Sequence, residues 1–439
     1  MLPGVGVFGT GAIAKVLIPL LREKGFEIRA IWGRTLKEAE EAASDLKITF
    51  HTNRIDDVLL RKDVDLVFVI CQPFLHAEIS VKALGIGKHV VCDKPMGLHQ
   101  ADAMKMVRAA QYYPTLISLV NHSLRFLPAF YHMKRCLHEQ MIGPIAEISL
   151  VDIRVNMGTL FPEKFDWMCD AAMGGGALNL VGSHVIDLVS FLLEQRAVRV
   201  HGLVKAYTKV TEGINGIRQI SAPDFCNFQM EFTNGTLVTA SLHSHTVSTN
   251  AFSQEVQICG RKGHLIVRGG DLFLNKAKSE SQPQPKEEVI YVDVQDLHVA
   301  TSGSLLPRPY IKGLCKMIGA LKEAFAGKES SWVKEPVQVA ANFEDGLYVH
   351  AVMEAIRKSN DSKTWQRIEI SSETTSNHDQ IMRFNSFVVV CDTTWRFLLF
   401  RKECTHSKSK LTLFTHEISL TMLIECKVTS RAGPLSVVL

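Results

Sequence analysis

Short apolar runs alternate with amphipathic stretches along the first 120 residues. Apolar runs that predict strands lie at residues 5–8, 27–32, 49–50, 64–71 and 89–92. Helical spacing marks the stretches between them, at residues 12–24, 36–46, 55–60 and 77–84. Strands that alternate with helices predict a parallel sheet with helices on both faces. The nearly continuous apolar run at 64–71 suits a strand buried on both sides.

The pattern changes after about residue 122, where long strands follow one another with few helices between them. Segments rich in valine and isoleucine lie at residues 145–155, 198–208, 224–232, 237–247, 255–259 and 264–267. Consecutive strands without crossover helices predict a mostly antiparallel sheet. Helices are predicted at residues 183–193, 309–325 and 344–358, and a polar surface loop at 278–288.

The last segment, residues 371–439, begins with a polar stretch and then carries scattered apolar patches, among them 387–391 and 395–400. It holds more lysine and arginine than aspartate and glutamate. No helix or strand pattern persists long enough to build a domain. We therefore expect a poorly ordered tail, with a membrane- or partner-binding tail as the alternative.

Composition and charge argue against several classes of function. The 439 residues are too many for one compact core and indicate two or three domains. A net charge of +4 gives no electrostatic case for binding nucleic acid or an anionic membrane. No apolar run reaches the roughly 18 residues of a membrane span. The ten cysteines show no metal-site spacing and suit a reduced, cytoplasmic protein, although the apolar residues 2–21 leave secretion open.

A glycine-rich motif follows the first predicted strand and opens the first predicted helix. Its G-x-G-x-x-A pattern consists of Gly9, Thr10, Gly11, Ala12, Ile13 and Ala14. Gly9 permits a tight turn, Gly11 lets the backbone approach a pyrophosphate, and Ala14 permits close packing of helix on strand. The free N–H groups and the dipole of the helix N-terminus then bind the phosphates. In this strand–turn–helix context the motif predicts a Rossmann domain that binds a nicotinamide dinucleotide.

The end of the second predicted strand distinguishes NADP from NAD. An aspartate or glutamate there binds the ribose 2′-hydroxyl of NAD, but this chain has Arg34 and Thr35. A guanidinium holds a 2′-phosphate by charge-assisted hydrogen bonds and stacks on adenine. These residues favour NADP, with NAD as the alternative if Arg34 is only a solvated loop residue.

Two polar residues far apart in the chain are candidates for proton transfer. Lys94 follows the strand at residues 89–92, at the carboxyl end where open α/β sheets bind ligands. His184 follows the triple glycine at 174–176, near the start of a predicted helix, and the ordinary pKa of histidine suits proton exchange. Either residue alone is weak evidence, because a loop lysine is usually solvated and a histidine beside Asp187 is often a buried, hydrogen-bonded one.

Together these motifs resemble the glucose-fructose oxidoreductase/inositol dehydrogenase/rhizopine-catabolism (Gfo/Idh/MocA) family. The matching residues are the glycine loop, His76-Ala77-Glu78 with Ala83-Leu84, Gly87-Lys88-His89-Val90, Asp93-Lys94-Pro95, Arg125-Phe126 with Pro128, and residues 174–187, 260–263 and 344–347. The resemblance covers roughly residues 3–370, so the tail lies outside it. Residues 1–11 and 83–88 look most like the animal glucose-fructose oxidoreductase domain-containing proteins.

The resemblance implies both a fold and a chemistry. The fold is α/β, with a Rossmann domain at residues 1–122. An α+β substrate domain follows at 123–370, whose large, mostly antiparallel open sheet forms a homo-oligomer interface. The chemistry is hydride transfer between C4 of the nicotinamide and the hydroxyl-bearing carbon of a sugar, polyol or related diol. Lys94 is then expected to contact the reacting hydroxyl, His184 to act as acid or base, and His76 and Lys94 to belong to the cofactor site.

Two positions depart from the family pattern. The family aspartate of the glycine-rich block is Leu180 here, and a leucine side chain neither binds a substrate hydroxyl nor orients a histidine. Asn179 does not replace it, because neighbours on a helix do not share a face. The loop after the fourth strand has Gln72-Pro73-Phe74, without the asparagine that meets the nicotinamide. Two hypotheses follow: an active NADP-dependent oxidoreductase, or a catalytically weak or inactive dinucleotide-binding scaffold, associated with the extracellular matrix.

Overall fold

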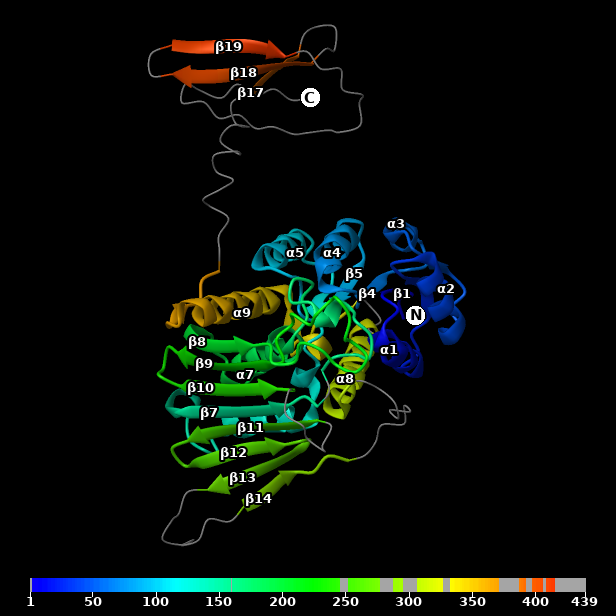
Figure 1. The fold of residues 1–439 in the computed structure, drawn as a ribbon. Helices are drawn as coiled ribbons and strands as arrows, with labels where there is room; N and C mark the ends of the chain where they lie inside the picture. The colour runs from blue at the N-terminus through cyan, green and yellow to red at the C-terminus, as the bar shows by residue number, and fades with distance from the viewer. Residues whose placement is uncertain are drawn as a thin grey trace. The chain divides into compact units, whose positions relative to one another are not determined.

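The computed structural model describes residues 2–158, 160–244, 252–276, 287–294, 306–326, 332–370, 387–391, 397–405 and 408–414. The chain divides into two compact units, Met1–Ser371 and Ser372–Leu439. The first unit contains a seven-stranded and a nine-stranded sheet with their helices, and the second contains a three-stranded sheet (Figure 1).

The seven-stranded sheet is a Rossmann sheet in the order β15-β6-β5-β4-β1-β2-β3, and its first six strands in the chain run parallel. These strands are β1 (Val5–Phe8), β2 (Ile28–Trp32), β3 (His51–Thr52), β4 (Leu66–Val69), β5 (His89–Cys92) and β6 (Ser118–Val120). The helices between them are α1 (Ala12–Glu23), α2 (Leu36–Leu46), α3 (Ile55–Leu59), α4 (His76–Gly85) and α5 (Gln100–Tyr112). Val5 and Val7 pack with α1 on one face, whereas Val67 and Val69 pack with α4 on the other. The predicted parallel sheet with helices on both faces is confirmed.

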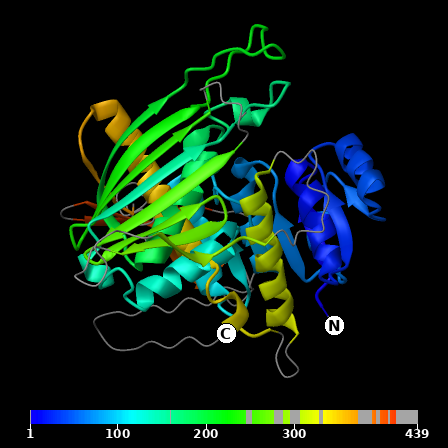
Figure 2. The same ribbon diagram turned by 90° about the horizontal axis from the view of Figure 1, so that it is seen from below.

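Segments from beyond residue 300 complete this layer. Helix α8 (Arg308–Phe325) packs against α1, with Met317 in the same core as Leu17. Strand β15 (Ala341–Asn342) pairs antiparallel with β6. Figure 2 shows α8, in yellow, between the blue N-terminal elements and the green strands of the second sheet. The chain therefore returns to the Rossmann layer after it has built most of the second sheet.

The nine-stranded sheet has the order β14-β13-β12-β11-β7-β10-β9-β8-β16, and only β7 and β10 pair in parallel. Its strands are β7 (Leu150–Asn156), β8 (Ala197–Lys205), β9 (Phe225–Phe232), β10 (Leu237–His243), β11 (Ser253–Gly260), β12 (Gly263–Arg268), β13 (Asp271–Lys276), β14 (Glu287–Tyr291) and β16 (Gln366–Arg367). The helices that share its core are α6 (Pro128–His138), α7 (Ser183–Leu193) and α9 (Phe343–Ser362). Phe130, Leu188 and Val352 from these helices join Ile153 and Leu242 in that core. The predicted large, mostly antiparallel sheet is confirmed.

Several predicted bounds were wrong. The strand predicted at 145–155 begins only at Leu150, because Ile145–Glu147 forms a 3-10 turn after Pro144. The short third strand lies at His51–Thr52 rather than at 49–50. Helices α5 and α6 and strand β6 were not predicted, and α5 buries only a narrow apolar stripe within polar surroundings. In the predicted surface loop at 278–288, residues up to 286 lie outside the described residues, and β14 begins directly after them.

The second unit is described by three strands, β17 (Phe387–Cys391), β18 (Phe397–Thr405) and β19 (Lys408–Phe414). They form an antiparallel sheet in that order, although the sequence pattern predicts no sheet here. Among the residues that the structure describes, no helix is long and apolar enough to cross a membrane. The same residues contain no group of three or more histidine, cysteine, aspartate or glutamate side chains that could hold a metal ion.

Candidate active site

The glycine loop joins the end of β1 to the start of α1. Gly9 has φ +134°, and a Cβ there would lie 2.9 Å from the carbonyl carbon and oxygen of Ile70, so only glycine fits this turn. A Cβ on Gly11 would meet nothing within 4 Å, which leaves open space in front of the helix. Gly11 precedes α1 without a side-chain cap, so the first N–H groups of the helix can bind an anion. With Ala14 fully buried beneath it, this loop fits the pyrophosphate of a dinucleotide.

Arg34 and Thr35 lie at the start of α2, just after β2. Thr35 is the helix N-cap, because its Oγ1 accepts a hydrogen bond of 3.2 Å from the Glu38 N–H. The Arg34 guanidinium donates to the Glu38 carboxylate at 2.7 Å, and the arginine side chain is 58% exposed. Both residues therefore stabilise the helix start, and a ligand phosphate at Arg34 has to displace the Glu38 carboxylate.

His76 connects the loops that follow β4 and β5. Its ring nitrogens lie 2.9 Å from the Cys71 carbonyl oxygen and 3.0 Å from the Pro95 carbonyl oxygen. The side chain is buried, and burial lowers its pKa. Main-chain carbonyl oxygens thus lie close to both ring nitrogens, and the neutral imidazole donates a hydrogen bond to one of them. His76 therefore links the loop after β4 to the loop that carries Lys94, and its contact with a cofactor stays a prediction.

Lys94 follows β5 and reaches the segment that precedes α7. Its Nζ donates to the main-chain carbonyl oxygen of Leu180 at 2.5 Å. Burial lowers the pKa of the ammonium group, and the Asp93 carboxylate opposes that shift. Asp93 itself accepts a hydrogen bond of 3.0 Å from the side-chain amide of Asn121. The residue predicted to contact the reacting hydroxyl is therefore half-buried and bonded to a neutral acceptor.

An irregular helical turn presents the acceptor for Lys94. Residues Leu178–Gly182 form a π-helical turn before α7, and such turns are frequent at functional sites. The Leu180 side chain packs against the core of the nine-stranded sheet, while its carbonyl meets Lys94. Asn179 accepts a hydrogen bond from Arg357 and donates one of 3.4 Å to the Gly175 carbonyl. Asn179 is thus engaged elsewhere and does not replace the family aspartate.

The triple glycine that precedes this turn packs against protein. A Cβ on Gly175 would lie 2.2 Å from the Met168 carbonyl oxygen, and one on Gly176 would lie 2.7 Å from the Pro223 ring. These glycines therefore allow close contact with other segments of the chain.

His184 lies in the first turn of α7 and is only 2% exposed. Its ring lies edge-on to the rings of His122 and Tyr310, with centroid distances of 5.5 and 4.7 Å. Burial, followed by Lys94 and His122, lowers its pKa well below the ordinary value, so the imidazole is neutral at neutral pH. Within the described part of the chain, its Nδ1 has no hydrogen-bond partner. Lys94 and His184, which are far apart in sequence, thus belong to one electrostatically coupled group.

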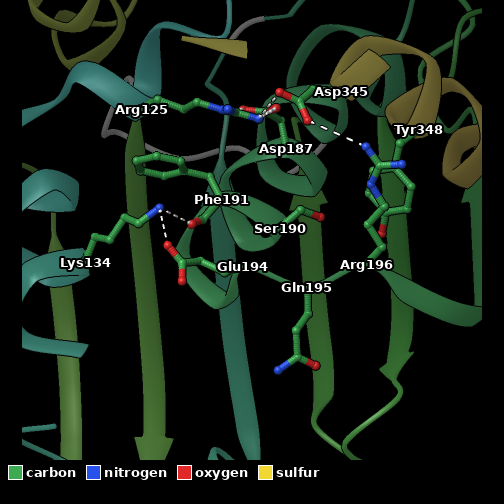
Figure 3. Close-up of a pocket in the computed structure, with 10 residues that line it drawn as sticks. All are labelled: Arg125, Lys134, Asp187, Ser190, Phe191, Glu194, Gln195, Arg196, Asp345 and Tyr348. Carbon is green, nitrogen blue, oxygen red and sulfur yellow. Dashed lines mark hydrogen bonds and ion pairs between the residues drawn. The ribbon is translucent and has the colours of Figure 1, made fainter. Parts of the chain in front are cut away.

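A buried ion cluster lies one turn further along α7. Arg125 donates to both carboxylate oxygens of Asp187, at 2.8 and 2.6 Å, and lies 3.2 Å from an oxygen of Asp345 (Figure 3). A cavity of about 450 Å³ opens beside these residues, and its lining includes Lys134 and Glu194. Neither Lys94 nor His184 lines this cavity. The cluster therefore anchors α7 to its neighbours.

Three residues outside the sequence motifs complete the group around His184. His122 follows β6, Tyr310 lies in the first turn of α8, and Gln254 lies on β11. The Tyr310 hydroxyl donates to Gln254 Oε1 at 3.4 Å. A sequence signal existed for His122, because it follows the carboxyl end of a parallel strand, but that strand was not predicted. Tyr310 and Gln254 belong to no motif, and only the tertiary fold brings them to His184.

Two family models match the first unit. The model described as "Oxidoreductase family, NAD-binding Rossmann fold" matches residues 4–120, and the "GFO/IDH/MocA C-terminal domain" model matches residues 130–266. Glucose-fructose oxidoreductase domain-containing protein 1 of Xenopus tropicalis is 44% identical over 375 residues, which cover 85% of this chain and 94% of that protein. The human glucose-fructose oxidoreductase domain-containing protein 2 is 42% identical over 382 residues, which cover 85% of this chain and 95% of that protein.

Solved structures share the fold. A levoglucosan dehydrogenase in complex with NADH and L-sorbose superposes with a TM-score of 0.70 at 19% identity, covering 84% of this chain and 100% of the dehydrogenase. A super-repressor mutant of Gal80p from Saccharomyces cerevisiae superposes with a TM-score of 0.67 at 16% identity, covering 83% of this chain and 98% of Gal80p. With both family models matched and close relatives over most of its length, the chain belongs to the Gfo/Idh/MocA family of oxidoreductases with an NAD-binding Rossmann fold.

Proposed function

We propose that the chain is an NAD(P)-dependent oxidoreductase that transfers hydride between the nicotinamide and a sugar-, polyol- or diol-like substrate. The observation that carries this proposal is the convergence of Lys94 and His184 on one buried site. That site begins at the carboxyl end of β5, and the glycine loop lies at the carboxyl end of the parallel strand β1. The levoglucosan dehydrogenase of similar fold binds NADH together with L-sorbose, which supports a carbohydrate-like substrate here.

NADP is the proposed dinucleotide, with NAD as the alternative. The glycine loop holds the pyrophosphate, and Arg34 holds the 2′-phosphate in exchange for the Glu38 carboxylate that it now binds. A phosphate offers more charge and more acceptor oxygens than that carboxylate, so the exchange is favourable. When bound, the nicotinamide supplies or accepts the hydride at C4.

Lys94 and His184 handle the proton of the reacting hydroxyl. Oxidation of an alcohol releases a proton as the hydride leaves, and the neutral imidazole of His184 accepts it. The Lys94 ammonium stabilises the negative charge that develops on the oxygen. In the reverse direction the protonated imidazole of His184 returns this proton to the oxygen, and the Lys94 ammonium again stabilises the negative charge on that oxygen.

Binding and turnover measurements on the purified full chain test this proposal. Titration with NADP, NADPH, NAD and NADH is followed by nicotinamide absorbance with a panel of sugars, polyols and carbonyl compounds. We expect binding of one dinucleotide pair, turnover, and a loss of about 10²–10⁴-fold in Lys94→Met and in His184→Gln. The control Lys105→Met, on the exposed side of α5, should keep full turnover. A cofactor-saturated protein without turnover refutes the catalytic proposal, and a protein that binds no dinucleotide refutes the cofactor proposal too.

A dinucleotide-binding scaffold of little or no activity is the second candidate, and Leu180 is the observation that favours it. Lys94 is bonded to a carbonyl rather than a carboxylate, and no residue in the described part orients His184 through Nδ1. A fold of this kind also occurs in the Gal80p super-repressor. Leu180→Asp tests the idea: turnover gained by this variant from an inactive wild type supports the scaffold, and an active wild type excludes it.

We also propose a cytoplasmic homo-oligomer built through the nine-stranded sheet. The face that carries Asp152, Thr239 and Gln257 is the one opposite α6, α7 and α9, and the strand register places these three residues side by side. The cysteines at positions 71, 92, 136, 169, 226, 259 and 315 are free thiols, which suits a reducing compartment. A monomer in sedimentation contradicts the oligomer, and a tagged chain that appears in the culture medium instead supports the secreted, matrix-associated alternative.

A further inference from the structure

Tyr310 and Gln254 meet beside His184, although they come from different layers of the unit. Tyr310 reaches in from α8, which packs on the Rossmann sheet, and Gln254 points in from β11 of the other sheet. The Tyr310 hydroxyl donates to Gln254 Oε1 at 3.4 Å, and the Tyr310 ring lies 4.7 Å from the His184 ring. The Phe252 ring also lies edge-on to the Tyr310 ring, with a centroid distance of 5.7 Å.

Several polar atoms in this group are buried without a partner. Gln254 is 3% exposed, and its Nε2 makes no hydrogen bond to any other part of the chain that the structure describes. Nδ1 of His184 and Nδ1 of His122 are also buried and have no hydrogen-bond partner in the described part of the chain. Buried polar groups in native proteins nearly always have a partner, because an orphaned one loses its hydration without compensation. Three such atoms around one ring system therefore indicate a polar ligand.

The pair offers both donors and an acceptor to that ligand. Once Tyr310 has donated to Gln254, the two amide N–H groups and a lone pair on the phenol oxygen remain. The opposite orientation of the amide also leaves groups of both kinds. Burial raises the pKa of Tyr310, so the phenol keeps its proton. A neutral hydroxyl group, which both accepts and donates, matches this buried and uncharged pair better than an ion does.

We propose that Tyr310 and Gln254 bind a second hydroxyl group of the substrate, next to the hydroxyl that Lys94 and His184 handle. The inference rests on the proposed function for the reacting hydroxyl and adds to it two residues that recognise the neighbouring hydroxyl of the substrate. The selectivity comes from the buried pair. A substrate that lacks the second hydroxyl leaves the Gln254 N–H groups buried and unpaired.

A matched pair of ligands tests the subsite without depending on turnover. Binding of trans-cyclohexane-1,2-diol and of cyclohexanol to the full chain is measured by saturation-transfer NMR, with and without NADPH. We expect wild type to bind the diol roughly 10–100-fold more tightly than the mono-alcohol. Gln254→Met, which keeps the length of the side chain, should reduce this ratio to below about 3-fold without changing the affinity for cyclohexanol. Tyr310→Phe should also reduce the ratio of diol affinity to mono-alcohol affinity.

Gln111→Met is the control, because Gln111 is an exposed glutamine on α5 and lies outside the group around Tyr310. It should keep the wild-type ratio. Equal affinities of wild type for the two ligands overturn the subsite, as does a ratio that survives both site variants. A diol preference in a protein without turnover keeps the subsite and refutes the proposed hydride transfer. Turnover with equal kcat/KM for diol and mono-alcohol keeps the proposed hydride transfer and refutes the subsite.

Discussion

His350 on α9 makes the stability of the chain sensitive to acid. Its Nε2 accepts a hydrogen bond of 3.1 Å from the N–H of Gly97, in the loop that carries Lys94. The side chain is 1% exposed, and burial, with smaller effects of Arg357 and nearby histidines, lowers its pKa to about 3. Protonation of Nε2 would remove the acceptor of this hydrogen bond, so the folded state holds His350 neutral.

The magnitude follows from the difference between folded and unfolded pKa values. Between pH 7 and pH 5 an unfolded imidazole, with a pKa of about 6.5, becomes almost fully charged, while folded His350 stays neutral. The unfolded chain then binds more protons, so acidification over this interval removes about 2 kcal/mol of stability. The contribution is fully present above about pH 6.5 and is lost progressively as the pH falls toward about 3.

Urea unfolding of wild type and His350→Gln at pH 7, 6 and 5 measures this contribution. Glutamine offers an oxygen to the Gly97 N–H but does not titrate. We expect the free energy of unfolding of the variant to fall by about 2 kcal/mol less than that of wild type between pH 7 and pH 5. Other buried histidines act equally in both proteins, and His51→Gln on β3 controls for the substitution itself. Parallel declines in wild type and variant would show that folded His350 titrates normally and would refute the reasoning.

Three further predictions concern the ion cluster, the cofactor and Lys94. Arg125→Met leaves the Asp187 carboxylate buried and unpaired, so it should cost about 3–5 kcal/mol in urea unfolding, and a loss below 1 kcal/mol contradicts the burial argument. Arg34→Ala should weaken NADPH binding roughly 10–100-fold and leave NADH binding unchanged, as measured by calorimetry; equal effects on both remove the case for NADP. Leu180→Asp should raise the pKa of Lys94 in pH-dependent reductive methylation, whereas the uncharged Leu180→Asn should not; identical titration in the two variants places the new carboxylate out of reach.

The sequence predicted those elements best whose defining residues lie close together along the chain. The apolar run that contains β4 and the glycine turn before α1 each lie within a few residues, so their patterns are complete in the sequence. Helix α5 was missed although Ala103, Met106 and Val107 have helical spacing, because such a short stripe among polar residues resembles a loop. The two-residue strand β15 carries no pattern of its own, and its pairing with β6 depends on the position of α9.

The candidate site likewise contains residues that the sequence predicted and residues that it did not. Lys94 and His184 stand in motifs and were predicted from them, whereas Tyr310 and Gln254 are single residues on separate elements. Their role depends on a contact between α8 and β11, which the spacing of residues along the chain does not reveal. The acceptor for Lys94 was unpredictable for a further reason: it is a main-chain carbonyl, a group that every residue has, exposed here by a π-helical turn.

The loss of the family aspartate changes the charge beside Lys94 more than it changes the position of Lys94. Asp187 lies one turn beyond His184 on the same face of α7, and its two hydrogen bonds to Arg125 fix the rotation of that helix. The turn before α7 then presents the Leu180 carbonyl to Lys94 without help from the side chain. Positioning therefore survives the substitution, and the missing contribution is the attraction of a carboxylate for the ammonium group and the imidazole. Because orientation accounts for a large part of the rate in such reactions, the chain should retain measurable catalysis, slower than that of a relative with the aspartate.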